Sequence, residues 1–75
     1  MSIGSNIKTI RQIKGMSQED LADAMGVTQA YISIYECGQR KPGEDVLNKI
    51  AKELGVSADL LKSETLAITA NGETF

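Results

Sequence analysis

The stretch MSQEDLADAMGVTQAYISIYECG, Met16–Gly38, holds two short helical patterns with almost no linker between them. Ser17 and Thr28 are typical N-cap residues, because their side-chain oxygens can accept hydrogen bonds from the N–H groups of a first helical turn. Gly26 and Gly38 follow the two patterns, at the place where glycine commonly ends a helix. The stretch therefore predicts two consecutive helices, each with its own start and stop signal.

The join between these two helices decides the fold. Gly26 and Val27 alone separate Met25, at the end of the first helix, from the Thr28 cap of the second. So short a turn, with a glycine in it, sets the second helix across the first at a large angle. This is the geometry of a helix-turn-helix unit.

Helical periodicity continues on both sides of this unit. Before it, isoleucines at i, i+4 and i+7 predict a helix that stops at Gly15. After it, Pro42 disfavours helix in the residue before it, and a further helix is predicted from about Glu44 to Gly55. Ser57 would cap a short fifth helix. The apolar positions of these three flanking helices are Ile3, Ile7, Ile10, Leu47, Ile50, Ala51, Leu54, Leu60 and Leu61.

Three segments in this order and spacing, Met16–Ala22, Gly26–Gln29 and Ile32–Gly38, resemble the phage-repressor/Cro-like (Xre-type, lambda-repressor-like) helix-turn-helix DNA-binding family. The resemblance implies an all-α fold, a compact five-helix lambda-repressor-like domain over residues 1–61. Helices two and three would form the helix-turn-helix. The resemblance also implies double-stranded DNA as the partner, with the third helix in the major groove.

The outer face of the third helix is where the resemblance implies base contacts, from Gln29, Ala30, Ser33 and Ile34. A glutamine can pair bidentately with adenine N6 and N7, although a solvated glutamine is also common in a first turn. Ala30 suits an apolar contact with a thymine methyl group. Ile34 would be an exposed isoleucine on an otherwise polar face, which favours a contact, although single surface isoleucines are normal.

Contacts to the DNA backbone are also implied by the resemblance. Ser17 and Thr28 are helix caps first, and the first turns that they begin present unsatisfied N–H groups suited to phosphates. Gln18 is also placed to brace Gln29. Tyr31 would either pack on the preceding helix or send its hydroxyl to a phosphate. The implied backbone contacts are Arg11, Ser17, Gln18, Thr28, Tyr31, Arg40 and Lys41, of which the last two could equally belong to a solvated basic loop.

Arg11 and Glu36 resemble a pair that, in this family, bridges helix one to the end of helix three. The resemblance implies either that Glu36 holds Arg11 beside the DNA backbone or that the pair locks the helices together, and the two roles are compatible. Cys37 departs from the polar residue often found there. We expect a buried or half-buried, unreactive thiol.

Composition excludes several kinds of chemistry. The chain has no His and a single Cys, which removes the usual structural zinc sites, nucleophile pairs with His, and any internal disulfide. We expect no enzymatic activity, metal, cofactor or small-molecule substrate. The net charge is −2, but five basic residues meet four acidic ones up to Gly43, against three and six from Glu44 onward. The acid is thus concentrated away from the first half.

The length of 75 residues is near the lower limit for a domain that folds alone, so a second copy would add useful burial. Lack of an apolar run near 18 residues and of a signal-peptide pattern leads us to expect a cytoplasmic protein without a membrane span. Residues 62–75 form a separate tail. Alternation at Leu66, Ile68 and Ala70 before an Asn71-Gly72 turn signal leaves two readings, disorder or a strand against a second subunit.

The function predicted on this basis is sequence-specific DNA binding by a transcriptional regulator, a repressor, acting as a homodimer on a near-palindromic operator. Two alternatives share the fold: the antitoxin of a toxin–antitoxin pair, with a toxin as partner, and the controller of a restriction–modification system. A third alternative is a protein-interaction module that no longer binds DNA, which the low positive charge favours.

Overall fold

The computed structural model describes residues 2–62, and the secondary structure in this range is entirely helical. The predicted all-α fold of five helices is confirmed. Its tail, with the alternating apolar residues of 66–70, lies outside the described residues. No helix within 2–62 has the length and apolar character needed to cross a membrane. The helices are α1 (Ile3–Ile13), α2 (Gln18–Met25), α3 (Gln29–Glu36), α4 (Glu44–Leu54) and α5 (Ala58–Lys62).

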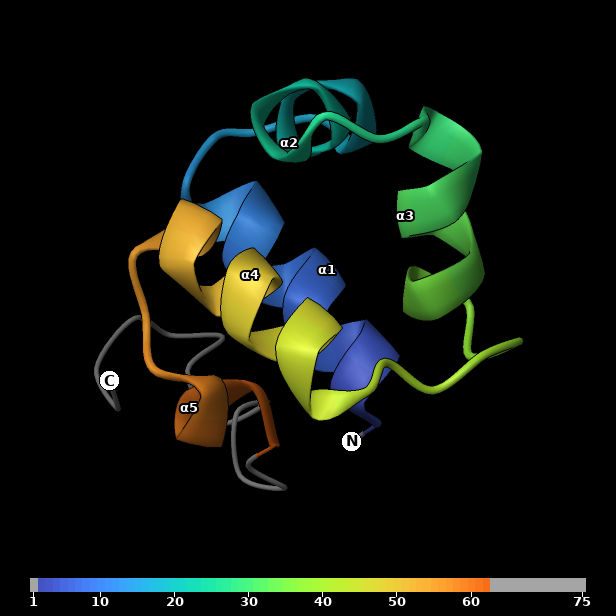
Figure 1. Cartoon of the computed structure of the whole chain (residues 1–75). Helices are drawn as coiled ribbons and strands as arrows, with labels where there is room; N and C mark the ends of the chain where they lie inside the picture. The colour runs from blue at the N-terminus through green and yellow to red at the C-terminus, as the bar shows by residue number, and fades with distance from the viewer. Residues whose placement is uncertain (1, 63–75) are drawn as a thin grey trace.

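The helices are arranged around the pair α1 and α4, which contact each other at the centre of the bundle (Figure 1). Helix α2 contacts α3 and α4, and α5 contacts α1 and α4. Helix α3 packs on α1 and α2 and stands at one edge of the molecule, with α5 at the opposite edge (Figure 1). One face of α3 is therefore directed away from the rest of the bundle.

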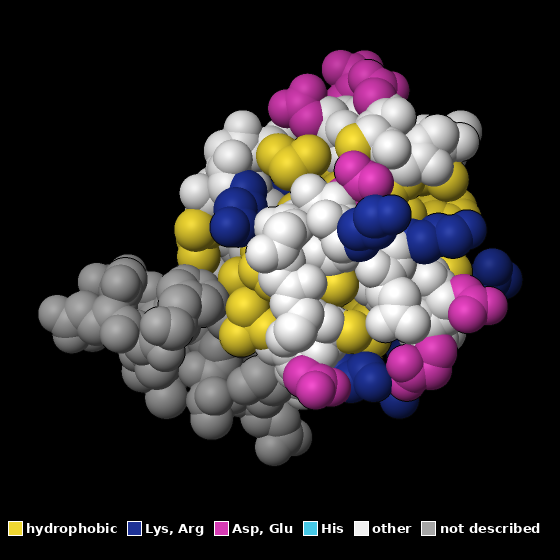
Figure 2. Space-filling model, turned by 60° about the vertical axis from the view of Figure 1, so that its left-hand side comes forward, with side chains coloured by type: hydrophobic (Ala, Val, Ile, Leu, Met, Phe, Trp, Pro, Cys, Tyr) yellow, Lys and Arg dark blue, Asp and Glu magenta, His cyan; other side chains and the backbone are white. Residues whose placement is uncertain are grey.

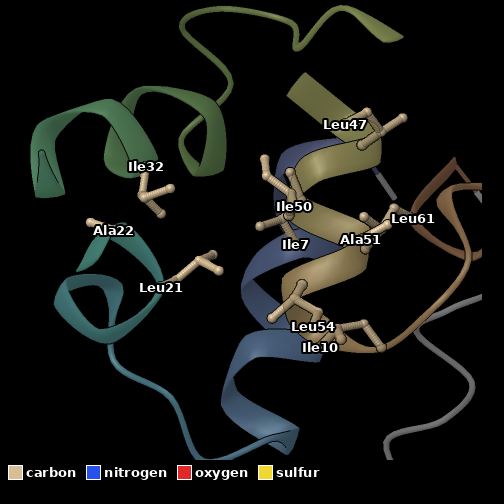
Figure 3. Packing of buried hydrophobic residues seen from close by; sticks show 10 residues of the cluster. All are labelled: Ile7, Ile10, Leu21, Ala22, Ile32, Leu47, Ile50, Ala51, Leu54 and Leu61. Carbon is tan, nitrogen blue, oxygen red and sulfur yellow. The ribbon is translucent and has the colours of Figure 1, made fainter. Parts of the chain in front are cut away.

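The core is a single cluster to which every helix contributes (Figure 3). The apolar positions expected from the helical periodicity are buried, except that Ile3 and Leu60 are half-buried and pack against its edge. Each fully buried leucine or isoleucine stabilises the fold by about 1.5–3 kcal/mol. The cluster consists of Ile7, Ile10, Leu21, Ala22, Ile32, Leu47, Ile50, Ala51, Leu54 and Leu61.

The helix-turn-helix is held by the caps that the sequence predicts. Ser17 Oγ accepts from the backbone N–H of Asp20 at 2.9 Å, and the Asp20 carboxylate accepts from the N–H of Ser17 at 3.0 Å. Thr28 Oγ1 accepts from the N–H of Tyr31 at 3.2 Å. Gly26 ends α2 with a φ of 71°, a left-handed conformation that favours glycine. Local hydrogen bonds thus fix both the start of α3 and its angle to α2.

Two contacts of α1 were not evident in the sequence. Gly4 lies so close to the end of α3 that a Cβ atom there would be 2.2 Å from the carbonyl oxygen of Tyr35. Asn6 is fully buried, and its Nδ2 donates to the carbonyl oxygen of Leu61 at 2.7 Å. Helix α1 is therefore tied to α3 at one side and to the last turn of α5 at the other.

Candidate nucleic-acid interface

The outward face of α3 carries the four residues expected to contact bases. Positions 29, 30, 33 and 34 form one stripe, because residues three and four apart are neighbours on a helix. Gln29, Ala30 and Ile34 are exposed, and Ser33 is half-buried. Ile34, a large apolar residue, is 38% exposed. The structure therefore presents a continuous surface of mixed polar and apolar character on one helix.

The starts of α2 and α3 lie close to each other beside this stripe, because Gln29 in the first turn of α3 donates a hydrogen bond to Gln18 in the first turn of α2. Ser17 and Thr28 are exposed, and each accepts a hydrogen bond from the first turn that it caps. The first turn of α2 contains the acidic residues Glu19 and Asp20, whereas that of α3 contains none. The positive end of the α3 dipole is thus less neutralised, which makes it the better of the two for a phosphate.

A chain of hydrogen bonds runs from the exposed start of α3 into the interior. Gln29 Nε2 donates to Gln18 Oε1 at 3.3 Å, and Gln18 Nε2 donates to Glu36 Oε1 at 3.1 Å. Glu36 also accepts from Arg11, through Nε at 2.7 Å and Nη2 at 3.0 Å. Arg11 Nη1 completes the chain by donating to the carbonyl oxygen of Met16 at 2.7 Å. Residues from α1, α2 and α3 are joined in this way.

The ion pair at the inner end of this chain is buried. The side chains of Arg11 and Glu36 are 7% and 3% exposed. The hydrogen bond to Glu36 raises the pKa of Arg11, although burial acts in the opposite direction. Loss of one partner would leave an uncompensated buried charge, at a cost of about 3–5 kcal/mol. The pair therefore locks α1 to the end of α3.

Tyr31 is half-buried and packs at the edge of the core. Its ring meets that of Tyr35 edge to face, with the ring centroids 5.1 Å apart. Burial, followed by the interaction with Tyr35, raises the pKa of Tyr31, so its hydroxyl stays protonated and able to donate at neutral pH. The ring of Tyr31 thus packs against Tyr35 of the same helix and against the edge of the core.

Arg40 and Lys41 lie in the loop after α3, and both are exposed. They border a groove of about 360 Å³ that also includes Lys62 and the first turn of α1. Lys62 is paired with Glu44 across 2.8 Å. The two loop residues therefore place exposed positive charge shortly after the end of α3.

Cys37 corrects one expectation. We expected a buried or half-buried thiol, but Cys37 is exposed, and its Sγ lies 3.5 Å from the carbonyl oxygen of Ile34. The reason is helical geometry. Cys37 is the C-cap of α3 and follows Ser33 by four residues, so it continues the outward stripe, while Ile32, Tyr35 and Glu36 occupy the inner face.

Charge on other faces is mixed. Figure 2 shows basic and acidic side chains interspersed, with acidic groups gathered at the top, the level of α2 in Figure 1. Ile13 is 53% exposed, which the spacing of the buried isoleucines on α1 did not predict. It borders an apolar groove of about 240 Å³ with Ile10, Lys14, Val56 and Leu60.

In the described range 2–62, no three His, Cys, Asp or Glu residues group as a metal site would require.

Comparison with known proteins agrees with this geometry. A family model described as Helix-turn-helix matches residues 7–61. The chain is 48% identical over 58 residues to the uncharacterized HTH-type transcriptional regulator Rv0474 of Mycobacterium tuberculosis, covering 77% of this chain and 41% of that protein. It is 39% identical over 64 residues to the SPbeta prophage-derived uncharacterized HTH-type transcriptional regulator YonR of Bacillus subtilis, covering 85% of this chain and 59% of YonR. This chain therefore matches only part of the length of these relatives.

The fold is also that of a solved regulator. The crystal structure of the clp gene regulator ClgR from Corynebacterium glutamicum superposes with a TM-score of 0.76 at 27% identity, covering 95% of this chain and 79% of that one. The family match covers the whole helix-turn-helix and α4, together with most of α1 and α5. The chain belongs to the Xre/Cro-like helix-turn-helix family, a family of non-enzymatic, DNA-binding transcriptional regulators.

Proposed function

We propose that this chain is a cytoplasmic repressor that binds double-stranded DNA in a sequence-specific way, as a homodimer on a near-palindromic operator. Residues 1–61 form the DNA-binding domain in this proposal. The observation that carries it is the exposed stripe of α3, which lies directly beside two capped helix starts. A helix in this setting fits the major groove with its first turns against base edges.

Base recognition is assigned to the stripe residue by residue. Gln29, in the first turn, pairs with adenine through its carbonyl oxygen and one N–H. Ala30 and the exposed Ile34 supply apolar surface for thymine methyl groups. Ser33 is half-buried, and its hydroxyl is placed for a short hydrogen bond to a donor or an acceptor group of a base.

Backbone contacts are assigned to the residues around the stripe. Arg40 and Lys41 are exposed and neutralise phosphates. The first turns that begin after Ser17 and Thr28 offer N–H groups, and the protonated Tyr31 hydroxyl and Gln18 donate to the backbone as well. The side chain of Arg11 is 7% exposed, so its main part is to hold α1 against α3, with a phosphate contact only at its exposed edge.

The homodimer is supported by the apolar groove between the end of α1 and the start of α5. Ile13, Val56 and Leu60 expose hydrophobic surface there, which a second copy would cover at the side of α5. The residues assigned to DNA lie on α2, α3 and the following loop, and remain available. Two recognition helices would then be placed about 34 Å apart, one turn of DNA.

Selection from a library of duplexes with a randomised central segment tests this proposal. We expect rounds of binding and sequencing to enrich an inverted repeat whose half-sites are about 10 base pairs apart, and sedimentation to show two protein chains on each selected duplex. No enrichment of any sequence would contradict the proposal. Enrichment of one half-site bound by a single chain would contradict the homodimer alone.

A second candidate is a module that binds another protein instead of DNA. The observation that favours it is the net charge of −2, with exposed acidic residues on α2. A DNA-binding surface needs local and not overall positive charge, however, and Arg40 and Lys41 provide it beside α3. The salt dependence of DNA binding, described below, separates the two candidates.

A further inference from the structure

Glu36 fixes the direction of the hydrogen bonds that end at Gln29. A carboxylate can only accept, and Glu36 faces the permanently charged guanidinium of Arg11. Gln18 lies 3.1 Å from Glu36 Oε1. It must therefore turn its NH₂ group inward, because its own carbonyl oxygen would repel the carboxylate.

The orientation of Gln18 fixes that of Gln29 in turn. With its NH₂ group on Glu36, Gln18 presents its carbonyl oxygen to Gln29 at 3.3 Å. A carbonyl oxygen accepts only, so Gln29 must donate one N–H to it. Gln29 then keeps its own carbonyl oxygen and its second N–H for a ligand, one acceptor and one donor.

This pattern matches one base in the major groove. Adenine presents a donor at N6 and an acceptor at N7, whereas guanine presents two acceptors, N7 and O6. If Gln18 pointed the other way, Gln29 would turn its carbonyl oxygen toward the Gln18 NH₂ group. Its own NH₂ group would then face the groove, and a pair of N–H donors suits the two acceptors of guanine.

We propose that Glu36 is a positioning residue for base specificity: through Gln18 it orients the carboxamide of Gln29 so that adenine is preferred to guanine. The proposal rests on the base contact of Gln29 proposed above. It gives the buried ion pair a role in sequence reading as well as in stability, because Arg11 holds the carboxylate in place through two hydrogen bonds. Glu36 itself, 8% exposed, acts only through Gln18 and Gln29.

Two variants change the orientation in different ways. In Gln18→Lys, the lysine ammonium group still donates a hydrogen bond to Glu36, but it also donates one to Gln29. The base preference should therefore pass from adenine to guanine. The double variant Arg11→Met with Glu36→Leu removes the carboxylate without leaving a buried charge unpaired, a replacement that proteins often tolerate. Gln18 then has no fixed orientation, and the discrimination between adenine and guanine should be lost. Gln29→Ala is the control that removes the reading group.

The experiment compares the affinity for the duplex selected by the unmodified chain with the affinity for the same duplex carrying guanine for adenine at the Gln29 position. Measured at one fixed salt concentration, the ratio cancels changes in phosphate binding. We expect a preference for adenine of roughly tenfold or more in the unmodified chain, a ratio near one in the double variant and in Gln29→Ala, and an inverted ratio in Gln18→Lys. Circular dichroism checks that each variant is folded.

Each outcome bears on a stated claim. An adenine preference that survives in both Gln18→Lys and the folded double variant, yet disappears in Gln29→Ala, overturns the role of Glu36 and leaves the proposed function intact. A preference that survives in Gln29→Ala overturns both the base contact and the inference built on it. If the double variant does not fold, Gln18→Lys tests the relay with the ion pair in place, and an adenine preference that survives in it overturns the path from Glu36 through Gln18 to Gln29.

Discussion

Gly4 lies where α1 and the end of α3 approach each other closely. A Cβ at this position would lie 2.2 Å from the Tyr35 carbonyl oxygen and 2.8 Å from that of Glu36. Both atoms belong to the backbone at the end of α3 and cannot move aside without shifting the helix. The position of the recognition helix on α1 therefore depends on the absence of a side chain here.

We expect Gly4→Ala to destabilise the domain by about 1–3 kcal/mol, because one added methyl group forces α1 away from α3. Urea unfolding followed by circular dichroism measures the change. Gln12→Ala, at an exposed position of the same helix, serves as the control and should change stability by less than about 0.5 kcal/mol. Equal stability of Gly4→Ala and the unmodified chain would show that the contact has no such role.

Single residues were predictable from the sequence where their role is local. The caps Ser17 and Thr28 act within three residues of themselves, and both are as predicted. Gly4 and the buried Asn6 were not, because their roles depend on helices that are distant in sequence. Cys37 was misjudged although the end of α3 was predicted, because its spacing of four residues after Ser33 places it on the outward stripe.

At the scale of elements, α4 begins differently from α2 and α3. Its N-cap is Gly43, with an extended conformation (φ −74°, ψ 173°) and no side-chain hydrogen bond to the first turn. A serine can adopt this conformation without strain, and nothing lies within 4 Å of a Cβ there. The first turn of α4 thus lacks a side-chain cap, although the backbone conformation at Gly43 would allow one.

We expect Gly43→Ser to stabilise the domain by about 0.5 kcal/mol, through the new cap and through a less flexible unfolded chain. Thermal and urea unfolding both measure it. The matched variant Gly55→Ser places the same side chain at a φ of 73° and should cost about 1 kcal/mol or more. A loss of stability in Gly43→Ser would mean that the start of α4 is not limited by its cap.

Helices were the most predictable level of this fold. Five helices were predicted from apolar spacing and stop signals, and the buried residues of α4 are the four expected ones. The packing partners of each helix were harder to predict, because the spacing of apolar residues shows which face is buried but not which helix covers it. The turn at Gly26 is the exception: its shortness alone implied the angle between α2 and α3.

For the whole molecule, charge distribution matters more than net charge. The net charge of −2 gives no sign of DNA binding, yet Arg40 and Lys41 lie exposed next to the end of α3. The sequence predicted this loop as basic but left open whether solvent or phosphate meets it. The sequence points to the outer faces of the fourth and fifth helices, with the tail, as the surface for a second copy. The groove proposed for that copy adds Ile13 of α1 to Val56 and Leu60, which the sequence did not predict because these residues come from separate elements.

We expect DNA affinity to fall steeply with salt in spite of the net negative charge, with a log–log slope near −0.9 for each phosphate neutralised. Arg40→Ala and Lys41→Ala should each weaken binding to all sequences about equally and flatten the slope by about 1. Fluorescence anisotropy at several salt concentrations measures this, with Lys52→Ala on α4 as the control. A flat response in the unmodified chain would favour the protein-binding candidate.

The measurement that tests the account most directly compares the unmodified chain with Gln29→Ala on the selected duplex and on random duplexes, at one fixed salt concentration. Thr28 still caps α3 in this variant, so thermal unfolding should be nearly unchanged. We expect affinity for the selected duplex to fall by about 1–3 kcal/mol and affinity for random DNA to change little, since phosphate contacts supply that binding. An equal loss on both DNAs would contradict the account and make Gln29 a positioning residue, with base recognition left to Ala30, Ser33 and Ile34.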